Sequence, residues 1–197
     1  METSSVLNVY RKLQKRSIKF VDYTILQHIT GLKNRNSLYK LASRMKQKKL
    51  LFSLNNAGKF LVADSNPSEF EIANFLYQPS YISLETALSF YGILAQFVYS
   101  ITSITTQKTQ KFIVSDKEYT YSQIKKDFYW GYVKKDNFLI ASPEKALLDA
   151  LYFFSKGVIN LSLKELDLSA INKKSLFVFQ KRFNDNGVNK QIKKLRI

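Results

Sequence analysis

The feature that most constrains the fold is a helical apolar pattern followed directly by two short strand patterns. Residues 38–45 carry apolar side chains at i, i+3, i+4 and i+7, which form one stripe along a helix. Asn36 or Ser37 can cap this helix with a side-chain oxygen. Residues 50–54 and 59–63 then read as two strands joined by a short turn that ends in glycine.

Two more helices are predicted upstream of this pattern. One covers residues 5–15, and the other begins at an N-cap, Asp22, and ends at Gly31. Helix, helix, turn, helix and hairpin is the order of a winged helix-turn-helix, so we predict this domain for residues 1–64. Residues 64–67 read as a linker, and residues 68–197 as a second domain.

The second domain mixes helix and strand patterns, so the predicted fold class is α+β. Ser142-Pro143-Glu144 is a strong helix start, because a capping hydroxyl precedes a proline at the first helical position and an acid in the first turn. The buried stripe expected for this helix is Leu147, Ala150, Leu151 and Phe154. The other predicted elements are helices at 69–76 and after the cap Ser83, strands at 97–106, 111–114, 119–124, 129–133 and 137–141, a turn or helix at 161–168, and basic amphipathic helices at 175–183 and 188–195.

Charge is distributed unevenly along the chain. The 31 Lys and Arg against 15 Asp and Glu give a net charge of +16, with +10 in residues 1–64, −1 in residues 65–170 and +7 in residues 171–197. Such asymmetry indicates a polyanionic partner, with nucleic acid as the first candidate and anionic lipid as the second. The alternative is that the protein is rich in surface lysines for no functional reason. Such an excess should appear in every segment, whereas residues 65–170 are close to neutral.

The helix after the turn is the predicted recognition helix. A helix-turn-helix places the N-terminal residues of this helix against base edges in the major groove, where arginine suits guanine and asparagine suits adenine. Lysines near the helix end and on the wing, the turn between the two strands, suit phosphates. The predicted DNA-binding residues are Arg35, Asn36, Ser37, Tyr39, Lys40, Arg44, Lys48, Lys49 and Lys59. The alternative is a winged helix used only for protein contacts.

Several kinds of chemistry lack their usual residues. The chain has no cysteine and one histidine, His28, which reads as a surface or packing residue, and its glycines are scattered singly. Glu144 and Asp149 lie five residues apart, so they do not share a helix face. We interpret Glu144 as serving the helix dipole and Asp149 as half of a local ion pair. Lys145 is either the partner of Asp149 or simply solvated. We therefore predict no enzyme activity, no metal and no cofactor.

The chain has no pattern typical of membrane insertion or secretion. Residues 2–5 follow Met1 without a basic segment leading into an apolar one. The uncharged stretch at 86–107 is interrupted by polar residues, whereas a spanning helix needs about 20 mostly apolar residues. We expect a cytoplasmic protein without a membrane partner.

Aromatic residues of the neutral middle leave one alternative open. They could stack bases on a sheet, as in single-strand binders, or simply fill a small α+β core, which is the interpretation we favour. This set comprises Tyr119, Tyr121, Phe128, Tyr129, Trp130, Tyr132 and Phe138.

Two segments of the second domain resemble one known family. Residues 81–92, YISLETALSFYG, resemble the segment YISLESALSYYG of the AbiEi-like antitoxins, and residues 141–149, ASPEKALLD, resemble that family's A-x-PEKALLD. The resemblance covers roughly residues 5–170, including the segment predicted as a winged helix. The wing departs from many relatives, because Asn55-Asn56-Ala57-Gly58-Lys59 replaces an arginine-glycine tip.

The resemblance implies a regulator of a type IV, abortive-infection toxin–antitoxin pair. It implies an N-terminal domain that binds double-stranded DNA at promoter repeats and represses its own operon, and a C-terminal antitoxin domain. The toxin would be similar to nucleotidyltransferases and would be opposed without a stable complex. Two alternatives remain, namely a winged-helix regulator without a toxin partner and an RNA-binding protein.

Overall fold

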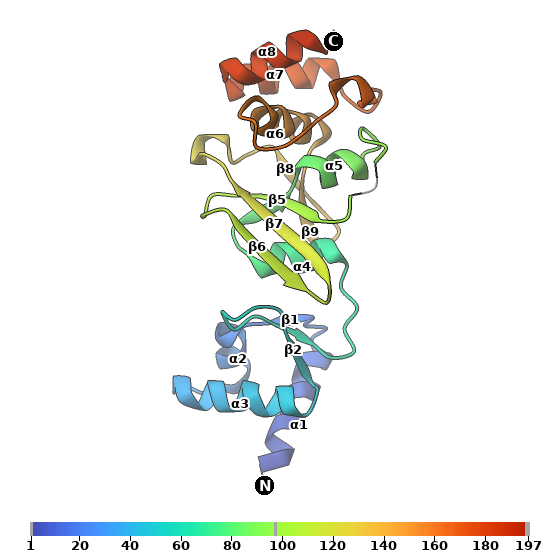
Figure 1. Ribbon diagram of the computed structural model, residues 1–197. Helices are drawn as coiled ribbons and strands as arrows, with labels where there is room; N and C mark the ends of the chain where they lie inside the picture. The colour runs from blue at the N-terminus through green and yellow to red at the C-terminus, as the bar shows by residue number, and fades with distance from the viewer. Residues whose placement is uncertain (1, 97, 196–197) are drawn as a thin grey trace. The chain divides into compact units, whose positions relative to one another are not determined.

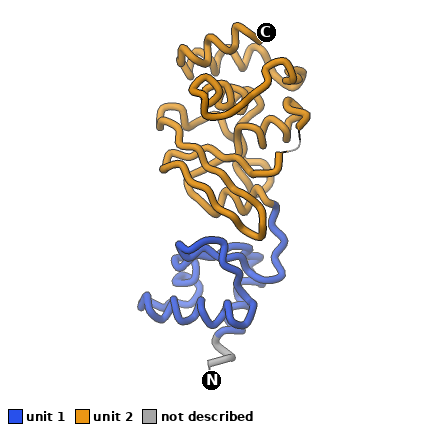
Figure 2. Tube along the Cα trace, viewed as in Figure 1, with its two compact units in different colours: residues 1–68 blue, residues 69–197 orange. Residues whose placement is uncertain are grey.

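The structure is a computed structural model that describes residues 2–96 and 98–195. Within these ranges the protein is mixed α+β, with eight α-helices and two sheets (Figure 1). The chain divides into two compact units, unit 1 at Met1–Ser68 and unit 2 at Glu69–Ile197 (Figure 2). The division falls just after the predicted linker at residues 64–67.

Unit 1 packs three helices against a small antiparallel sheet. The strand order is β1-β3-β2, with Leu51 opposite Val62 in one pair and Phe20 opposite Leu61 in the other. The elements are α1 (Glu2–Lys15), β1 (Phe20–Val21), α2 (Tyr23–Thr30), α3 (Arg35–Gln47), β2 (Leu51–Ser53) and β3 (Phe60–Val62). The predicted order of helices and hairpin is thus present, and β1 adds a third strand between the first two predicted helices.

Local chemistry fixes both ends of α2. The Asp22 side chain accepts a hydrogen bond from the Ile25 amide, as predicted for an N-cap. Gly31 ends the helix at φ 72°, a left-handed conformation that glycine adopts without steric cost. Leu26 and Ile29 then point into a single core shared with α1, α3 and the sheet.

The predicted cap of α3 is wrong by two or three residues. Asn34 is the N-cap, and its side-chain oxygen accepts from the amides of Asn36 at 2.8 Å and Ser37 at 3.4 Å. Asn36 and Ser37 therefore lie inside the first turn and are themselves capped. Asn34 has extended backbone angles, which let its side chain fold back over the exposed amides.

Unit 2 combines a six-stranded mixed sheet with five α-helices in its described part. Its strand order is β6-β7-β5-β4-β9-β8, in which β5 and β7 are parallel, β4 and β9 are parallel, and the other pairs are antiparallel. The elements are α4 (Glu69–Leu76), β4 (Ser80–Ile82), α5 (Leu84–Phe90), β5 (Ile101–Thr105), β6 (Gln110–Val114), β7 (Lys117–Gln123), η1 (Lys126–Phe128), β8 (Tyr132–Lys135), β9 (Phe138–Ala141), α6 (Pro143–Ser155), η2 (Leu163–Glu165), α7 (Lys173–Phe183) and α8 (Asn186–Lys194).

Two predicted strands are shorter in the structure. Pairing at 97–106 is confined to β5, and Phe97 lies outside the described residues. The strand predicted at 129–133 begins only at Tyr132, because a 3-10 turn and Gly131 at φ 75° precede it. A Cβ at Gly131 would come within 2.9 Å of the Lys145 Cγ, so the backbone runs directly against α6 here.

Helix α6 is buried on most of its surface rather than along one stripe. Ser142 caps it and Pro143 starts it, as predicted. Ten of its thirteen residues are buried, whereas Phe154, predicted in the buried stripe, is half-exposed. The apolar stripe was an incomplete prediction because β9, α5 and the two C-terminal helices all pack around this helix.

Candidate nucleic-acid interface

Helix α3 is held in unit 1 by its apolar stripe, which leaves the opposite face exposed. Leu38, Leu41, Ala42 and Met45 are all buried, as predicted. A helix with one buried stripe presents its remaining residues to solvent. The predicted recognition helix therefore has an open face about three turns long.

The predicted DNA-binding residues of α3 lie in two neighbouring rows on that face. Asn36, Lys40 and Arg44 are spaced four residues apart and are all exposed, and Arg35 and Tyr39 form the adjacent row. The guanidinium carbon of Arg35 lies 5.5 Å from the centre of the Tyr39 ring. The structure thus brings a guanidinium, an amide and an ammonium together near one end of the helix.

The other four predicted site residues lie at less uniform positions. Ser37 is half-buried in the first turn, and its amide is taken up by Asn34. Lys48 and Lys49 are exposed directly after α3, with Lys49 in a left-handed conformation. Lys59 is half-buried, and burial lowers its pKa while Asp22 opposes the shift. Lys59 is therefore less open to a phosphate than a residue at an exposed wing tip would be.

An aromatic contact that the sequence did not predict connects α2, α3 and the β2–β3 turn. The Tyr23 ring packs edge-on against Tyr39, with centroids 4.6 Å apart, and against Phe60 at 5.6 Å. A Cβ at Gly58 would lie 2.1 Å from the Tyr23 ring, so only glycine fits this turn, whose φ is 80°. Burial raises the pKa of Tyr23. The contact fixes Tyr39, and Tyr39 in turn supports Arg35.

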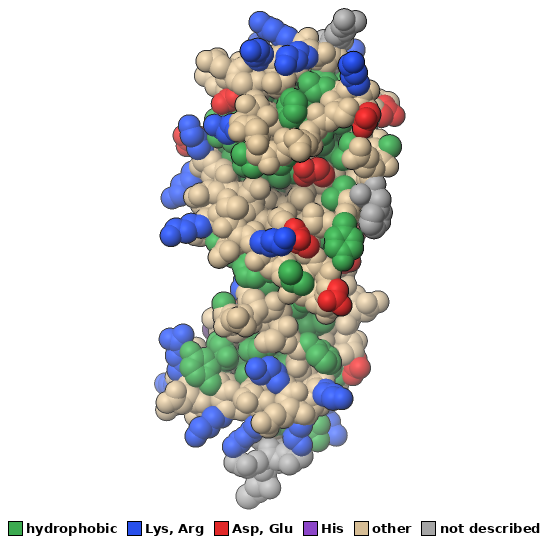
Figure 3. All heavy atoms as spheres, in the orientation of Figure 1, with side chains coloured by type: hydrophobic (Ala, Val, Ile, Leu, Met, Phe, Trp, Pro, Cys, Tyr) green, Lys and Arg blue, Asp and Glu red, His purple; other side chains and the backbone are tan. Residues whose placement is uncertain are grey.

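The surface of unit 1 is strongly positive. Residues 1–64 contain 13 basic and 3 acidic residues, and Figure 3 shows Lys and Arg side chains spread over the visible face of this unit. One acid, Asp64, accepts a hydrogen bond from the Tyr10 hydroxyl at 2.6 Å. Another, Asp22, is the N-cap of α2. Helix α3 itself contains no Asp or Glu, so the charged side chains that it contributes are all basic.

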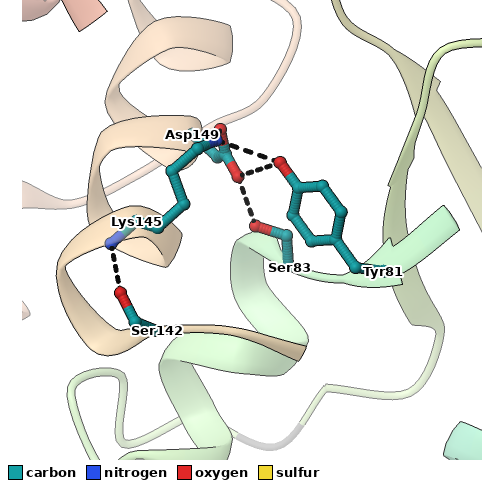
Figure 4. Close-up of polar contacts among 5 residues, drawn as sticks. All are labelled: Tyr81, Ser83, Ser142, Lys145 and Asp149. Carbon is teal, nitrogen blue, oxygen red and sulfur yellow. Dashed lines mark hydrogen bonds and ion pairs between the residues drawn. The ribbon is translucent and has the colours of Figure 1, made fainter. Parts of the chain in front are cut away.

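Unit 2 holds a polar cluster that is entirely buried. Lys145 and Asp149 form an ion pair within α6, with both side chains fully buried. Asp149 also accepts hydrogen bonds from the hydroxyls of Tyr81 and Ser83, each at 2.9 Å, and the Lys145 ammonium lies 3.0 Å from the Tyr81 oxygen (Figure 4).

The cluster explains why Ser83 does not act as the predicted cap. Ser83 occupies the N-cap position of α5, but its hydroxyl makes no capping bond and donates to Asp149 instead. The predicted local pair of Lys145 and Asp149 is confirmed, and its burial was not foreseen. Its partners join α6 to β4 and to the start of α5, so the cluster acts as a structural tie.

Glu144 and His28, the remaining residues considered in the sequence, have structural or surface positions. Glu144 accepts a hydrogen bond from the Asn172 amide, which anchors the start of α7, in addition to its place in the first turn of α6. His28 is exposed on α2. In the described residues no group of three or more His, Cys, Asp or Glu side chains comes together. Over the same ranges no helix has the length and apolar character needed to cross a membrane.

The aromatic residues of the middle segment mostly belong to the core. Tyr119, Tyr121, Trp130 and Phe138 are buried, and the rest of that set is half-buried. The Tyr121 hydroxyl donates to the Ala73 carbonyl at 2.7 Å, so even its polar end is engaged inside unit 2. These rings support the interpretation as core rather than as an exposed stacking platform.

The sequence matches no known family model and no curated protein.

Proposed function

We propose that unit 1 is a winged helix-turn-helix that binds double-stranded DNA with α3 in the major groove. The observation that carries this proposal is the pair of rows on α3, Asn36-Lys40-Arg44 and Arg35-Tyr39, exposed opposite a buried stripe. In this assignment the β2–β3 turn is the wing and β1 is the third strand of the small sheet. Arg35 and Asn36 would read base edges, while Lys48 and Lys49 would contact phosphates.

We further infer that the whole chain is an AbiEi-like antitoxin that represses its own operon and opposes a nucleotidyltransferase-like toxin. Support comes from the segments 81–92 and 141–149, which resemble that family. Both segments contribute to the buried cluster of Figure 4, because Tyr81 and Ser83 lie in the first and Lys145 and Asp149 in the second. Residues of the two segments thus depend on each other for their buried hydrogen bonds and charge balance, which is a physical reason for both segments to occur in one protein.

The first test measures binding of the full chain to duplex DNA from upstream of its own gene, against a shuffled duplex of equal length. With ~5 phosphates neutralised, the logarithm of the binding constant should fall with the logarithm of salt concentration at a slope of roughly −4 to −5. A slope shallower than about −2, or equal affinity for both duplexes, would contradict the proposed DNA site.

The second test is a growth assay in which the chain is co-expressed with the nucleotidyltransferase-like gene expected beside its own. Rescue of growth by the full chain, without co-purification of the two proteins, is the expected result. The α3 variant Arg35→Ala should still rescue, since the antitoxin role is assigned to unit 2. DNA binding without rescue would favour the alternative of a regulator that has no toxin partner.

A further inference from the structure

The two C-terminal helices present an exposed surface that neither the DNA site nor the buried cluster uses. On α7, Lys173, Phe177 and Lys181 lie four residues apart along one row. All three are exposed, and Phe177 retains 44% of its surface. An aromatic ring thus lies between two ammonium groups, one helical turn to either side. Leu176 and Phe183, about a third of the way round the helix from this row, are buried.

The charges of this surface have no acidic partners within the described residues. The lysines of the two helices are exposed and take part in no ion pair there; they are Lys173, Lys174, Lys181, Lys190, Lys193 and Lys194. The nearest acid in sequence, Asp185, caps α8 by accepting from the Val188 amide at 3.0 Å. The surface is therefore positive, and its cations are available to a ligand.

A groove of about 440 Å³ opens beside Phe177. It is lined by Phe177, Gln180, Lys181, Asn184 and Asn189, so it combines one ring, one ammonium and three amides. The amide of Gln180 donates to the side-chain oxygen of Asn189 at 2.8 Å, which holds the two helices in register. Side-chain amides offer both donors and acceptors, as the polar edge of a base and a ribose hydroxyl require.

The surface is anchored rigidly to unit 2. The Phe183 ring stacks on Phe128 with centroids 4.3 Å apart, and Phe179 packs edge-on against Trp130 at 5.1 Å. Because α7 is held by these rings, Phe177 is fixed on the outer side. A pre-positioned ring loses less freedom when a ligand stacks on it.

We propose that this groove binds an unpaired nucleotide of single-stranded RNA, with the base stacked on Phe177. Lys173 and Lys181 contact the flanking phosphates, and the amides of Gln180 and Asn189 meet the base edge and the 2′-hydroxyl. Exposed aromatic rings beside cations are the usual platform for single strands, whose bases are free to stack. A duplex hides its bases, and a membrane surface requires a continuous apolar face, whereas α7 exposes Phe177 and Val178 among lysines and buries Leu176 and Phe183.

The site is separate from the DNA site proposed on α3, so each can fail without the other. The test uses the full chain and a fluorescently labelled 12-nucleotide RNA of mixed sequence, with the matching DNA strand, the DNA duplex, acidic vesicles and polyglutamate as comparison ligands. Phe177→Ala should weaken RNA binding about tenfold, the scale of one lost stacking contact. The matched control is Val178→Ala, which removes a more exposed apolar side chain that does not line the groove.

Emission from Trp130, the single tryptophan, reports whether α7 stays docked in each variant. The expected result is a selective loss of RNA binding in Phe177→Ala, with unchanged Trp130 emission, unchanged duplex affinity and little effect of Val178→Ala. Equal losses in the two variants, or no loss in Phe177→Ala, would overturn the stacking site. Tighter binding of vesicles, polyglutamate or the DNA strand than of RNA would overturn the assigned ligand.

Discussion

Helices α3 and α6 have the same length and the same kind of beginning, yet they meet opposite environments. Each has thirteen residues and starts at a side-chain cap, Asn34 for α3 and Ser142 for α6. Four residues of α3 are buried, compared with ten of α6. Local sequence therefore determines that both segments are helices, while the surrounding chain determines how much of each is covered.

The difference is clearest for their lysines. Lys40 on α3 is exposed, so its charge remains hydrated and available to a phosphate. Lys145 on α6 is fully buried, and its charge is balanced by Asp149. Burial lowers the pKa of Lys145 and raises that of Asp149, while their mutual attraction opposes both shifts. The same residue type is thus open to solvent on one helix and part of the internal structure on the other.

The largest effect should come from breaking the buried pair. Lys145→Met leaves the Asp149 carboxylate buried without its cation, so the free energy of unfolding should fall by about 3–5 kcal/mol. The matched change on α3, Lys40→Met, should alter it by no more than about 0.5 kcal/mol, because the side chain is exposed. Urea unfolding of both variants measures the contrast. Similar costs for the two would mean that the pair is not the tie described above.

The double variant Lys145→Met/Asp149→Leu sharpens this test, since it removes both charges and keeps similar volume. Its unfolding free energy should lie closer to wild type than that of Lys145→Met, because replacing a whole buried pair with apolar groups is often neutral or stabilising. The Tyr81 and Ser83 hydroxyls lose Asp149 as their acceptor, so part of the loss should persist. A double variant as unstable as the single one would show that packing and these two hydroxyls, rather than the unpaired charge, cause the loss.

The unfolding free energy of Lys145→Met should depend on pH through Asp149, which stays buried without its cation. Burial raises the pKa of Asp149, and in this variant no lysine opposes that shift. A carboxyl group whose folded-state pKa lies above its unfolded value stabilises the fold at low pH, and this contribution is lost as pH rises through the folded value. The variant should therefore recover part of its stability on acidification, as urea unfolding at several pH values would show. Stability that falls steadily with acidification would contradict the assignment.

The sequence predicted α3 better than α6 for a physical reason. A helix on the surface shows its buried face as a regular apolar stripe, and 38–45 carries that stripe. A helix that is covered all round has no contrasting face, so 143–155 showed only part of its burial. The Lys145–Asp149 pair was predictable from its i,i+4 spacing. Its burial was not, because Tyr81 lies 64 residues from Lys145 in the chain.

The candidate DNA site shows the same limit. Residue type and helical phase predicted the exposed row on α3. Tyr23, which supports Tyr39, was missed because its contacts with Tyr39 and Gly58 join elements that only the tertiary fold brings together. A tyrosine directly after the cap of α2 carries no local signal for such a role. The sequence did predict a turn that ends in Gly58. It did not predict that the Tyr23 ring leaves no space there for a larger residue.

An intermediate effect is expected at the DNA site proposed on α3. Arg35→Ala should weaken binding to the upstream duplex by roughly 1–3 kcal/mol and leave the shuffled duplex nearly unaffected, because a base contact carries sequence information. Lys49→Ala should weaken both duplexes about equally, as loss of a phosphate contact does. Fluorescence anisotropy at fixed salt measures both variants. Equal losses on both duplexes for Arg35→Ala would mean that α3 does not read bases.

The smallest effect concerns the two caps, where the helices should behave alike. Asn34→Ala and Ser142→Ala each remove one capping side chain, so each should lower the free energy of unfolding by about 1 kcal/mol. Only Asn34→Ala should also weaken DNA binding, because the turn that it frays carries Arg35 and Asn36. Asn34→Asp separates the two roles, since aspartate caps as well as asparagine but adds a negative charge next to the proposed DNA site. This variant should keep wild-type stability and still lose affinity, and affinity equal to wild type would place Asn34 away from the phosphate backbone.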